Sequence, residues 1–356
     1  MPSGDLQISS VIRKSNKRKA VVITVSLLLL FLSIIVSISL GSVKMSPKET
    51  IEVLFLGRTY VNGPYGSVNA HEAVFGLRLP RVLCAAFIGA ALAAAGAAMQ
   101  GLFRNPMASP SVIGISNGAA FGACAAMVLW FSVVSGAFAK PIMAFIFAFI
   151  TLFLVYFMAR TKLGVPVTML LLSGIAIGAF FGGLVSLLQY VAPEQQLGGV
   201  VFWLMGNISS CGWNDLKIII LPIVFGSIIL ILFSKDLNLL SLGDDQAKNL
   251  GVNVERTRII ILCATALLVA GAVSVSGVIG FVGLIVPHIF RMLLGPDHRL
   301  LIPASLVGGA IFLVIVDTIS RLIVTGGLPV GIITALLGAP FFLYILRTRK
   351  KEVWGG

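Results

Sequence analysis

Ten apolar stretches separated by short polar segments decide what kind of protein this chain can form. They cover residues 20–40, 82–101, 112–133, 141–159, 167–188, 214–233, 259–276, 279–294, 301–320 and 329–346. The hydrocarbon core of a bilayer requires helices of about 20 apolar residues. Since 58% of the 356 residues are hydrophobic and the mean hydropathy is +1.04, a water-soluble fold could not bury so much apolar surface. The sequence therefore predicts an all-α integral membrane protein with ten transmembrane helices.

The polar residues form tails and loops and no separate soluble domain. We expect residues 1–19 to be an N-terminal tail, residues 20–346 to be the ten-span domain, and residues 347–356 to be a C-terminal tail. The first apolar stretch is too long for a cleavable secretion signal, and no small-residue cleavage site follows it. It is therefore expected to remain as the first span.

The distribution of Lys and Arg predicts the orientation in the membrane. With ten spans both termini lie on one side, and that side carries 18 of the Lys and Arg residues while the other carries 8. Since positively charged loops stay in the cytoplasm, we expect both termini and the segment 234–258 to be cytoplasmic, in a protein of the cytoplasmic membrane. The net charge of +13 then reflects topology and attraction to anionic lipid head groups, and it indicates no nucleic-acid partner.

Three arginines are exceptions to that charge bias. Arg78 and Arg81 precede the second span, and Arg321 ends the ninth, all on the expected outer side. Because arginine pairs bidentately with carboxylates, one interpretation is a docking patch for acidic groups of an external partner. Two alternatives stay open, namely snorkelling to lipid phosphates and, for Arg321, an i,i+4 ion pair with Asp317.

No catalytic or metal site is apparent. The sequence lacks a Walker-type phosphate-binding loop, so the chain is not expected to hydrolyse ATP or to be an enzyme. Its four cysteines are isolated and lack metal-ligand spacing, and His288 is interpreted as a structural residue. Nearly all acidic residues lie at span ends or in loops, whereas ion-coupled carriers place ionisable groups at mid-membrane. A transporter of this composition needs energy from a partner.

The segment 234–258 is suited to receive such a partner. It carries four basic and four acidic residues in a chain that is 11% charged. Leu237, Leu239, Leu240, Leu242 and Leu250 recur among these charges at roughly helical spacing. Because a plain loop needs no amphipathic pattern, we interpret the segment as a docking surface on the aqueous side.

Several long motifs occur in the order found in one transporter family. They are LRLPRVLCAAFIGAALAAAGAAMQGLFRNPMASPSVIGISNGA (77–119), WLMGNISSCGW (203–213), LNLLSLGDDQAKNLGVNVERTR (237–258), SGVIGFVGLIVPHIFRMLLGPDHR (276–299) and LPVGIITALLGAPFFLYIL (328–346). With these motifs the chain resembles the FecCD-type permeases of iron-siderophore, haem and cobalamin importers. The resemblance begins near residue 20 and leaves out residues 1–19 and 57–73.

The resemblance implies the type II ABC importer permease fold. Two ten-span subunits, here expected to be a homodimer, would bind two cytoplasmic ATPase subunits that carry ATP and Mg. An external solute-binding protein would dock on the outer arginines Arg78, Arg81 and Arg321. This chain would bind no cofactor itself. The coupling element would be residues 237–251, with Gly243 and Gly251 at turns, Asp244, Asp245 and Lys248 facing solvent or the ATPase, and Leu239, Leu240, Leu242 and Leu250 as anchors.

The family also implies a cytoplasmic gate. Its residues would be Asn105, Pro106 and Met107 between spans two and three, and Val167 and Thr168 at the start of span five. A plain turn is the alternative for Asn105-Pro106, since that pair favours turns. Cobalamin permeases have two small hydroxyl residues where this chain has Val167-Thr168, which argues weakly against cobalamin.

These observations predict a permease subunit that imports a metal chelate. The cargo we expect first is a ferric siderophore, with haem and cobalamin as alternatives. Two other classes remain as alternatives, a secondary transporter driven by an ion gradient and a membrane scaffold that moves no solute.

Overall fold

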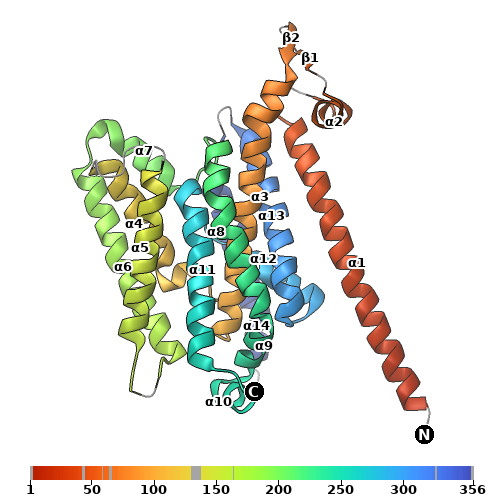
Figure 1. Cartoon of the computed structure of the whole chain (residues 1–356), viewed down its shortest axis with the longest axis vertical. Coiled ribbons are helices and arrows are strands. Elements are labelled where there is room, and N and C mark those ends of the chain that lie inside the picture. Colours follow the sequence, from red (N-terminus) through yellow and green to blue (C-terminus); the bar gives the residue numbers. More distant parts are fainter. Residues whose placement is uncertain are drawn as a thin grey trace.

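The computed structural model describes residues 3–41, 45–57, 59–63, 66–129, 138–162, 164–324 and 327–353. Within these ranges, seven helices are long and apolar enough to cross a membrane, and three apolar helices are shorter (Figure 1). The all-α membrane fold is therefore confirmed, with one helix for each of the ten predicted spans. These helices are α1 (Ser3–Ser39), α3 (Leu79–Leu102), α4 (Ile115–Val128), α5 (Ala139–Ala159), α6 (Val167–Val191), α8 (Trp213–Leu232), α11 (Val254–Ser276), α12 (Val282–Leu294), α13 (His298–Ile323) and α14 (Val330–Val353).

Helix α3 lies at the centre of the bundle and contacts α8, α11, α12 and α13. Glycines allow the close approach. Gly89 of α3 faces Gly309 of α13, and Gly96 faces Gly283 of α12. A Cβ atom at Gly89 or Gly96 would overlap the backbone carbonyl of the opposing glycine. The small residues of the sequence thus form helix contacts at backbone distance, as tight membrane packing requires.

Helices α4, α5 and α6 form a second group, and α11 joins this group to the centre by contacting α3, α4, α5 and α8. Gly122 of α4 lies against the backbone of α5 in the same way, and Gly118 lies against the Thr151 side chain of α5. A short helix, α7 (Glu194–Leu204), follows α6 and lies at the upper end of the bundle (Figure 1). The apolar stretches of the sequence did not predict α7.

Several boundaries differ from the predicted spans. The second span begins at Glu72, ten residues before the expected start at 82, because a π-helix, η1 (Glu72–Arg78), runs directly into α3. A short 3-10 helix, η2 (Pro110–Ile113), precedes α4 and ends at Gly114, whose φ is +76°. Residues 130–133, the predicted end of the third span, lie outside the described residues.

The two predicted tails are largely helical. Residues 3–19 form the first part of α1, and residues 347–353 form the last part of α14. The physical reason at the N-terminus is that residues 5–40 contain neither Gly nor Pro, so nothing in the sequence ends the helix before the apolar stretch starts.

A small unit lies at the end of the bundle where α1 ends and α3 begins (Figure 1). It consists of α2 (Pro47–Leu56) and an antiparallel hairpin of β1 (Tyr60–Gly63) and β2 (Gly66–Asn69). Ser46 begins α2 with a capping box, because its hydroxyl accepts from the Glu49 N–H while the Glu49 carboxylate accepts from the Ser46 N–H.

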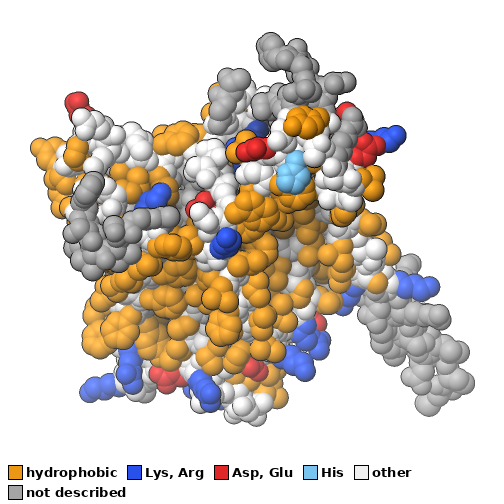
Figure 2. All heavy atoms as spheres, turned by 45° about the horizontal axis from the view of Figure 1, so that its top comes forward, with side chains coloured by type: hydrophobic (Ala, Val, Ile, Leu, Met, Phe, Trp, Pro, Cys, Tyr) orange, Lys and Arg blue, Asp and Glu red, His pale blue; other side chains and the backbone are white. Residues whose placement is uncertain are grey.

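The surface has the polarity that a membrane requires. Figure 2 shows a broad band of hydrophobic side chains with charged side chains gathered below and above it. Both chain ends and the helices of segment 234–258 lie at one end of the bundle, and the hairpin lies at the other (Figure 1). The shared location of the termini agrees with an even number of spans. That this end faces the cytoplasm stays a prediction, and two residues of the charge count, Lys44 and Arg58, lie outside the described residues.

Candidate functional site

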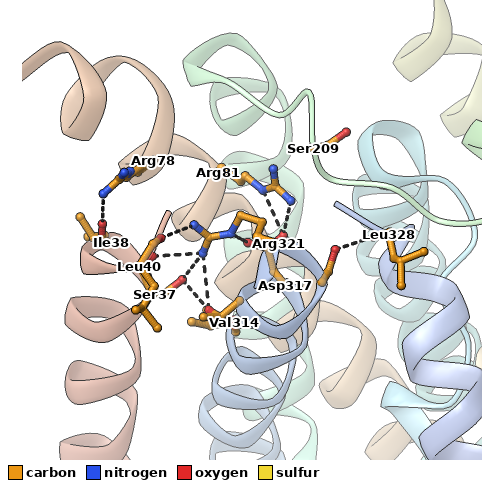
Figure 3. A network of polar contacts seen from close by, with 12 residues as sticks. Ser37, Ile38, Leu40, Arg78, Arg81, Ser209, Val314, Asp317, Arg321 and Leu328 are labelled. Carbon is orange, nitrogen blue, oxygen red and sulfur yellow. Dashed lines mark hydrogen bonds and ion pairs between the residues drawn. The ribbon is translucent and has the colours of Figure 1, made fainter. Parts of the chain in front are cut away.

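The three outer arginines lie together where η1 ends, α3 begins and α13 ends (Figure 3). Nε and Nη2 of Arg81 donate to Oδ1 of Asp317 at 3.0 and 2.7 Å. Nε of Arg321 forms an ion pair with Oδ2 of the same carboxylate at 3.1 Å, which confirms the predicted i,i+4 pair. Asp317 is completely buried, so two neighbouring guanidinium groups share the single negative charge of one carboxylate inside the protein.

Two of these arginines also close the end of α1. Nη1 of Arg78 donates to the Ile38 carbonyl at 2.8 Å. Nη1 of Arg321 donates to the Leu40 carbonyl at 3.0 Å, and its Nη2 donates to the Ser37 carbonyl at 3.1 Å (Figure 3). The last carbonyls of a helix lack intrahelical partners, and cations near them are favourable. The arginines therefore bind the end of α1 to η1 and α13, a role that the sequence did not indicate.

The arginine cluster also borders a cavity of about 400 Å³, which we call the outer recess. It is lined by the three arginines together with Gly41, Ala73, Gly76, Leu77 and residues 209–212. The side chains of Arg81 and Arg321 are only 14% and 12% exposed. An external carboxylate would therefore reach them through this recess and not on an open surface. Docking of a partner here stays a prediction.

At the opposite end, the segment 234–258 folds into two short helices, α9 (Ser234–Leu242) and α10 (Asp244–Asn249). Gly243 separates them with a φ of +128°, and Gly251 follows α10 with a φ of +88°. Side chains disfavour such backbone angles, so glycine is the suitable residue at both turns. The predicted pair of short helices with turns at these glycines is confirmed.

The leucines of this segment divide into two sets. Leu237 and Leu240 are buried, and Leu239 is half-buried, so they anchor α9 to the bundle. Leu242 and Leu250 are 58% and 59% exposed, and their predicted role as anchors is wrong. Both directly precede a turning glycine, where the chain leaves the buried side of its helix. They form an exposed apolar surface instead.

The charged residues of α10 also differ from one another. The side chains of Asp245 and Lys248 are 98% and 61% exposed, as predicted. Asp244 is only 32% exposed, and its predicted position facing solvent or the ATPase stays a prediction. Its carboxylate pairs with Arg104 at 3.1 Å and with Arg258 at 2.8 Å, and so is bonded into the protein.

The predicted gate residues lie beside these two arginines. Asn105, Pro106 and Met107 follow Arg104 directly. The Asn105 side chain accepts a hydrogen bond from the Met107 N–H at 2.9 Å, which agrees with the plain turn given as the alternative for Asn105-Pro106. Val167 and Thr168 begin α6. Met107 and Val167 are half-buried, while Asn105 and Thr168 are exposed. A gating role for these residues stays a prediction.

A second polar link holds α9 against the start of α13. The Asn238 amide donates to Asp297 at 2.7 Å and accepts from the His298 N–H at 2.8 Å. Asp297 also accepts from Arg299, whose hydrogen bonds hold the pKa of that carboxylate well below its usual range. Asn238 is a polar residue among leucines, and this local contrast could have identified it in the sequence.

His288 has the surroundings of a structural residue. It is buried in α12, and its ring packs edge-on against Phe341 with 6.3 Å between ring centroids. This packing agrees with the structural interpretation made from the sequence.

The chain is similar to known transport proteins. The model of the FecCD transport family matches residues 28–348. The cobalamin import system permease protein BtuC of Halobacterium salinarum is 44% identical over 80% of this chain and 76% of its own length. The hemin transport system permease protein HmuU of Yersinia pestis is 41% identical over 78% of this chain and 83% of its own. A solved inward-facing structure of a transporter assigned to the metal-chelate ABC type aligns with a TM-score of 0.79 at 34% identity, over 92% of this chain and 99% of that one.

Proposed function

The chain belongs to the FecCD transport family, and on that premise we propose that it is the membrane-spanning permease subunit of an ATP-driven importer of a metal chelate. We favour a ferric siderophore as the cargo, with haem or cobalamin as the alternative. Relatives that carry hemin and cobalamin, and a structural neighbour of the metal-chelate type, support a bulky metal complex as the class of cargo.

The observation that carries this proposal is the pair of charged sites at opposite ends of one helix bundle. The outer recess presents arginines at one end, and α9 and α10 present exposed charges and leucines at the other. A permease that is loaded from outside and driven from inside needs a contact surface at each end. We propose that an external solute-binding protein docks at the recess. Two ATPase subunits, which carry ATP and Mg, dock at α10 of each chain in a homodimer.

The proposed mechanism is alternating access. ATP binding closes the ATPase dimer and displaces the docked α9–α10 pair, and rocking of the two permease bundles opens one mouth while the other closes. Small-residue contacts such as those of α3 with α12 and α13 let each bundle move as a rigid body.

Uptake by reconstituted vesicles tests the function. The permease is purified with its ATPase, placed in proteoliposomes that enclose ATP and Mg, and supplied with binding protein and radiolabelled ferric siderophore, hemin or cobalamin. We expect uptake that requires enclosed ATP, continues after an ionophore dissipates ion gradients, and is fastest with ferric siderophore. Uptake that continues without ATP but stops with ionophore would identify a secondary transporter. Absence of flux with every cargo would favour a scaffold.

Removing one outer arginine is expected to weaken docking of the binding protein. In Arg81→Gln the loss of one cation should raise the Kd about tenfold at low salt and less at high salt, because salt screens partly exposed charges. Titration of labelled binding protein against the permease in nanodiscs measures this. Lys217→Gln, which removes an exposed cation on α8 outside the recess, is the control. An unchanged Kd for a folded Arg81→Gln protein would contradict the assignment.

A further inference from the structure

One carboxylate on α10 joins two segments that are far apart in the sequence. Oδ1 of Asp244 accepts a hydrogen bond from Nη2 of Arg104 at 3.1 Å, and Oδ2 accepts one from Nη2 of Arg258 at 2.8 Å. Each oxygen therefore binds a different arginine. Because both oxygens are engaged, a displacement of the carboxylate must either move the two arginines or break their ion pairs.

The Arg104 arm reaches the first segment of the predicted gate. Arg104 has a φ of +50°, a backbone conformation that is uncommon for residues other than glycine. Its N–H donates to the Gly101 carbonyl at 3.2 Å, and the next N–H, that of Asn105, donates to the Gln100 carbonyl at 3.1 Å. The turn is thus fixed to the end of α3 through Arg104 and Asn105. A force on the Arg104 side chain acts on the residue directly before Asn105-Pro106-Met107.

The Arg258 arm reaches the second segment. The Arg258 side chain is 4% exposed, and its Nη1 donates to the Val165 carbonyl. Val165 is buried and precedes Pro166, whose ring restricts the backbone of both residues. Val167 then begins α6. Movement of the Val165 carbonyl is therefore transmitted along a stiff connection to the start of α6.

We propose that Asp244 is the positioning residue that couples α10 to both segments of the cytoplasmic gate at once. This inference rests on the proposed function, since it assumes that an ATPase displaces α10. Asp244 would act through Arg104 on residues 105–107 and through Arg258 and Val165 on residues 167–168. One acidic residue would then make the two gate segments move together.

The variant Asp244→Asn tests this role, because it keeps the shape of the side chain and removes its charge. In the complete complex we expect transport per ATP hydrolysed to fall about tenfold, within the range that coupling between two sites usually spans. Glu194→Gln makes the equivalent chemical change at the start of α7, at an exposed side chain outside the docking segment, and should keep the wild-type ratio. Asp244→Glu, which restores a carboxylate, should recover part of the lost coupling.

A second measurement follows the gate itself. Spin labels at Thr168→Cys of the two subunits report the separation of the gate by pulsed EPR. ATP should change this separation in the wild-type background and in Glu194→Gln, but not in Asp244→Asn. A role limited to folding would leave the ATP-induced change intact in whatever complex assembles.

Two results would overturn the inference. One is an Asp244→Asn complex with the wild-type ratio of transport to ATP and the wild-type gate displacement. The second result applies if the Asp244→Asn complex does not assemble. It is a wild-type ratio of transport to ATP in Arg104→Gln, which removes only the more exposed ion pair, that of Asp244 with Arg104. Failure of the wild-type complex to transport would contradict the proposed function, whereas wild-type transport with an unaffected Asp244→Asn variant contradicts only the role of Asp244.

Discussion

Replacing Asp317 with asparagine is expected to lower the free energy of unfolding by about 3 kcal/mol, the usual cost of removing one partner from a buried ion pair. Asp317 is fully buried and is the carboxylate partner of both Arg81 and Arg321. The amide would leave two nearby guanidinium groups without a counter-charge, while α1 still depends on Arg321 for its last carbonyls. Thermal and denaturant unfolding of the purified protein in detergent measure the change.

Two further variants make this prediction specific. Asp236→Asn, the same substitution on a partly exposed aspartate of α9, should change the stability by less than about 0.5 kcal/mol. Arg81→Gln should lower the free energy of unfolding by less than Asp317→Asn does, because the ion pair of Arg321 with Asp317 remains. In the variant that combines Arg81→Gln with Asp317→Asn, the two losses of unfolding free energy should not add, since both residues belong to one network of ion pairs. Wild-type stability of Asp317→Asn would show that the pair does not hold this end of the bundle.

Replacing Gly96 with alanine is expected to be the most damaging single-methyl change in the bundle, with a loss of about 3 kcal/mol or more. The new Cβ atom would overlap the carbonyl of Gly283, which is backbone and cannot rotate away as a side chain can. Helices α3 and α12 would have to separate, and α3 also contacts α8, α11 and α13. The yield of folded protein and its unfolding temperature in detergent report the effect.

The matched control is Gly183→Ala on α6. Gly183 is exposed, and a Cβ atom there would meet nothing within 4 Å. In an open helix position alanine is favoured over glycine by about 1 kcal/mol, so this change should be neutral or stabilising. The two substitutions should therefore have opposite signs. A similar effect at both positions would contradict the close contact between α3 and α12.

The membrane helices could be predicted because hydropathy is a local property. Each apolar stretch needs only its own residues to identify it, and a helix was found for every one. Helix α7 and the hairpin were missed because they are too short or too polar to give that signal. The early start of the second span at Glu72 was missed for a related reason, since charged residues at its end interrupt the apolar pattern without interrupting the helix.

The candidate site could be predicted only in part. Gly243 and Gly251 were identified as turns because glycine suits positive φ angles regardless of its neighbours. The exposure of Leu242 and Leu250 depends on how α9 and α10 lie against the bundle, which helical spacing alone does not specify. The three arginines could be identified in the sequence by their charge on the expected outer side. Their hydrogen bonds to the end of α1 could not be predicted from it.

The sequence by itself determined that this is a membrane protein of ten spans, with one end rich in cations and an amphipathic segment between its sixth and seventh spans. Only the tertiary structure decided which charges meet. Asp317 binds Arg81 across 236 residues, and Asp244 binds Arg104 across 140. Such pairs depend on the rotation and depth of each helix in the bundle, and these are set by backbone contacts such as that of Gly96 with Gly283. The sequence shows that small residues are present, but the structure shows which helices they bring together and therefore which buried charges are neutralised.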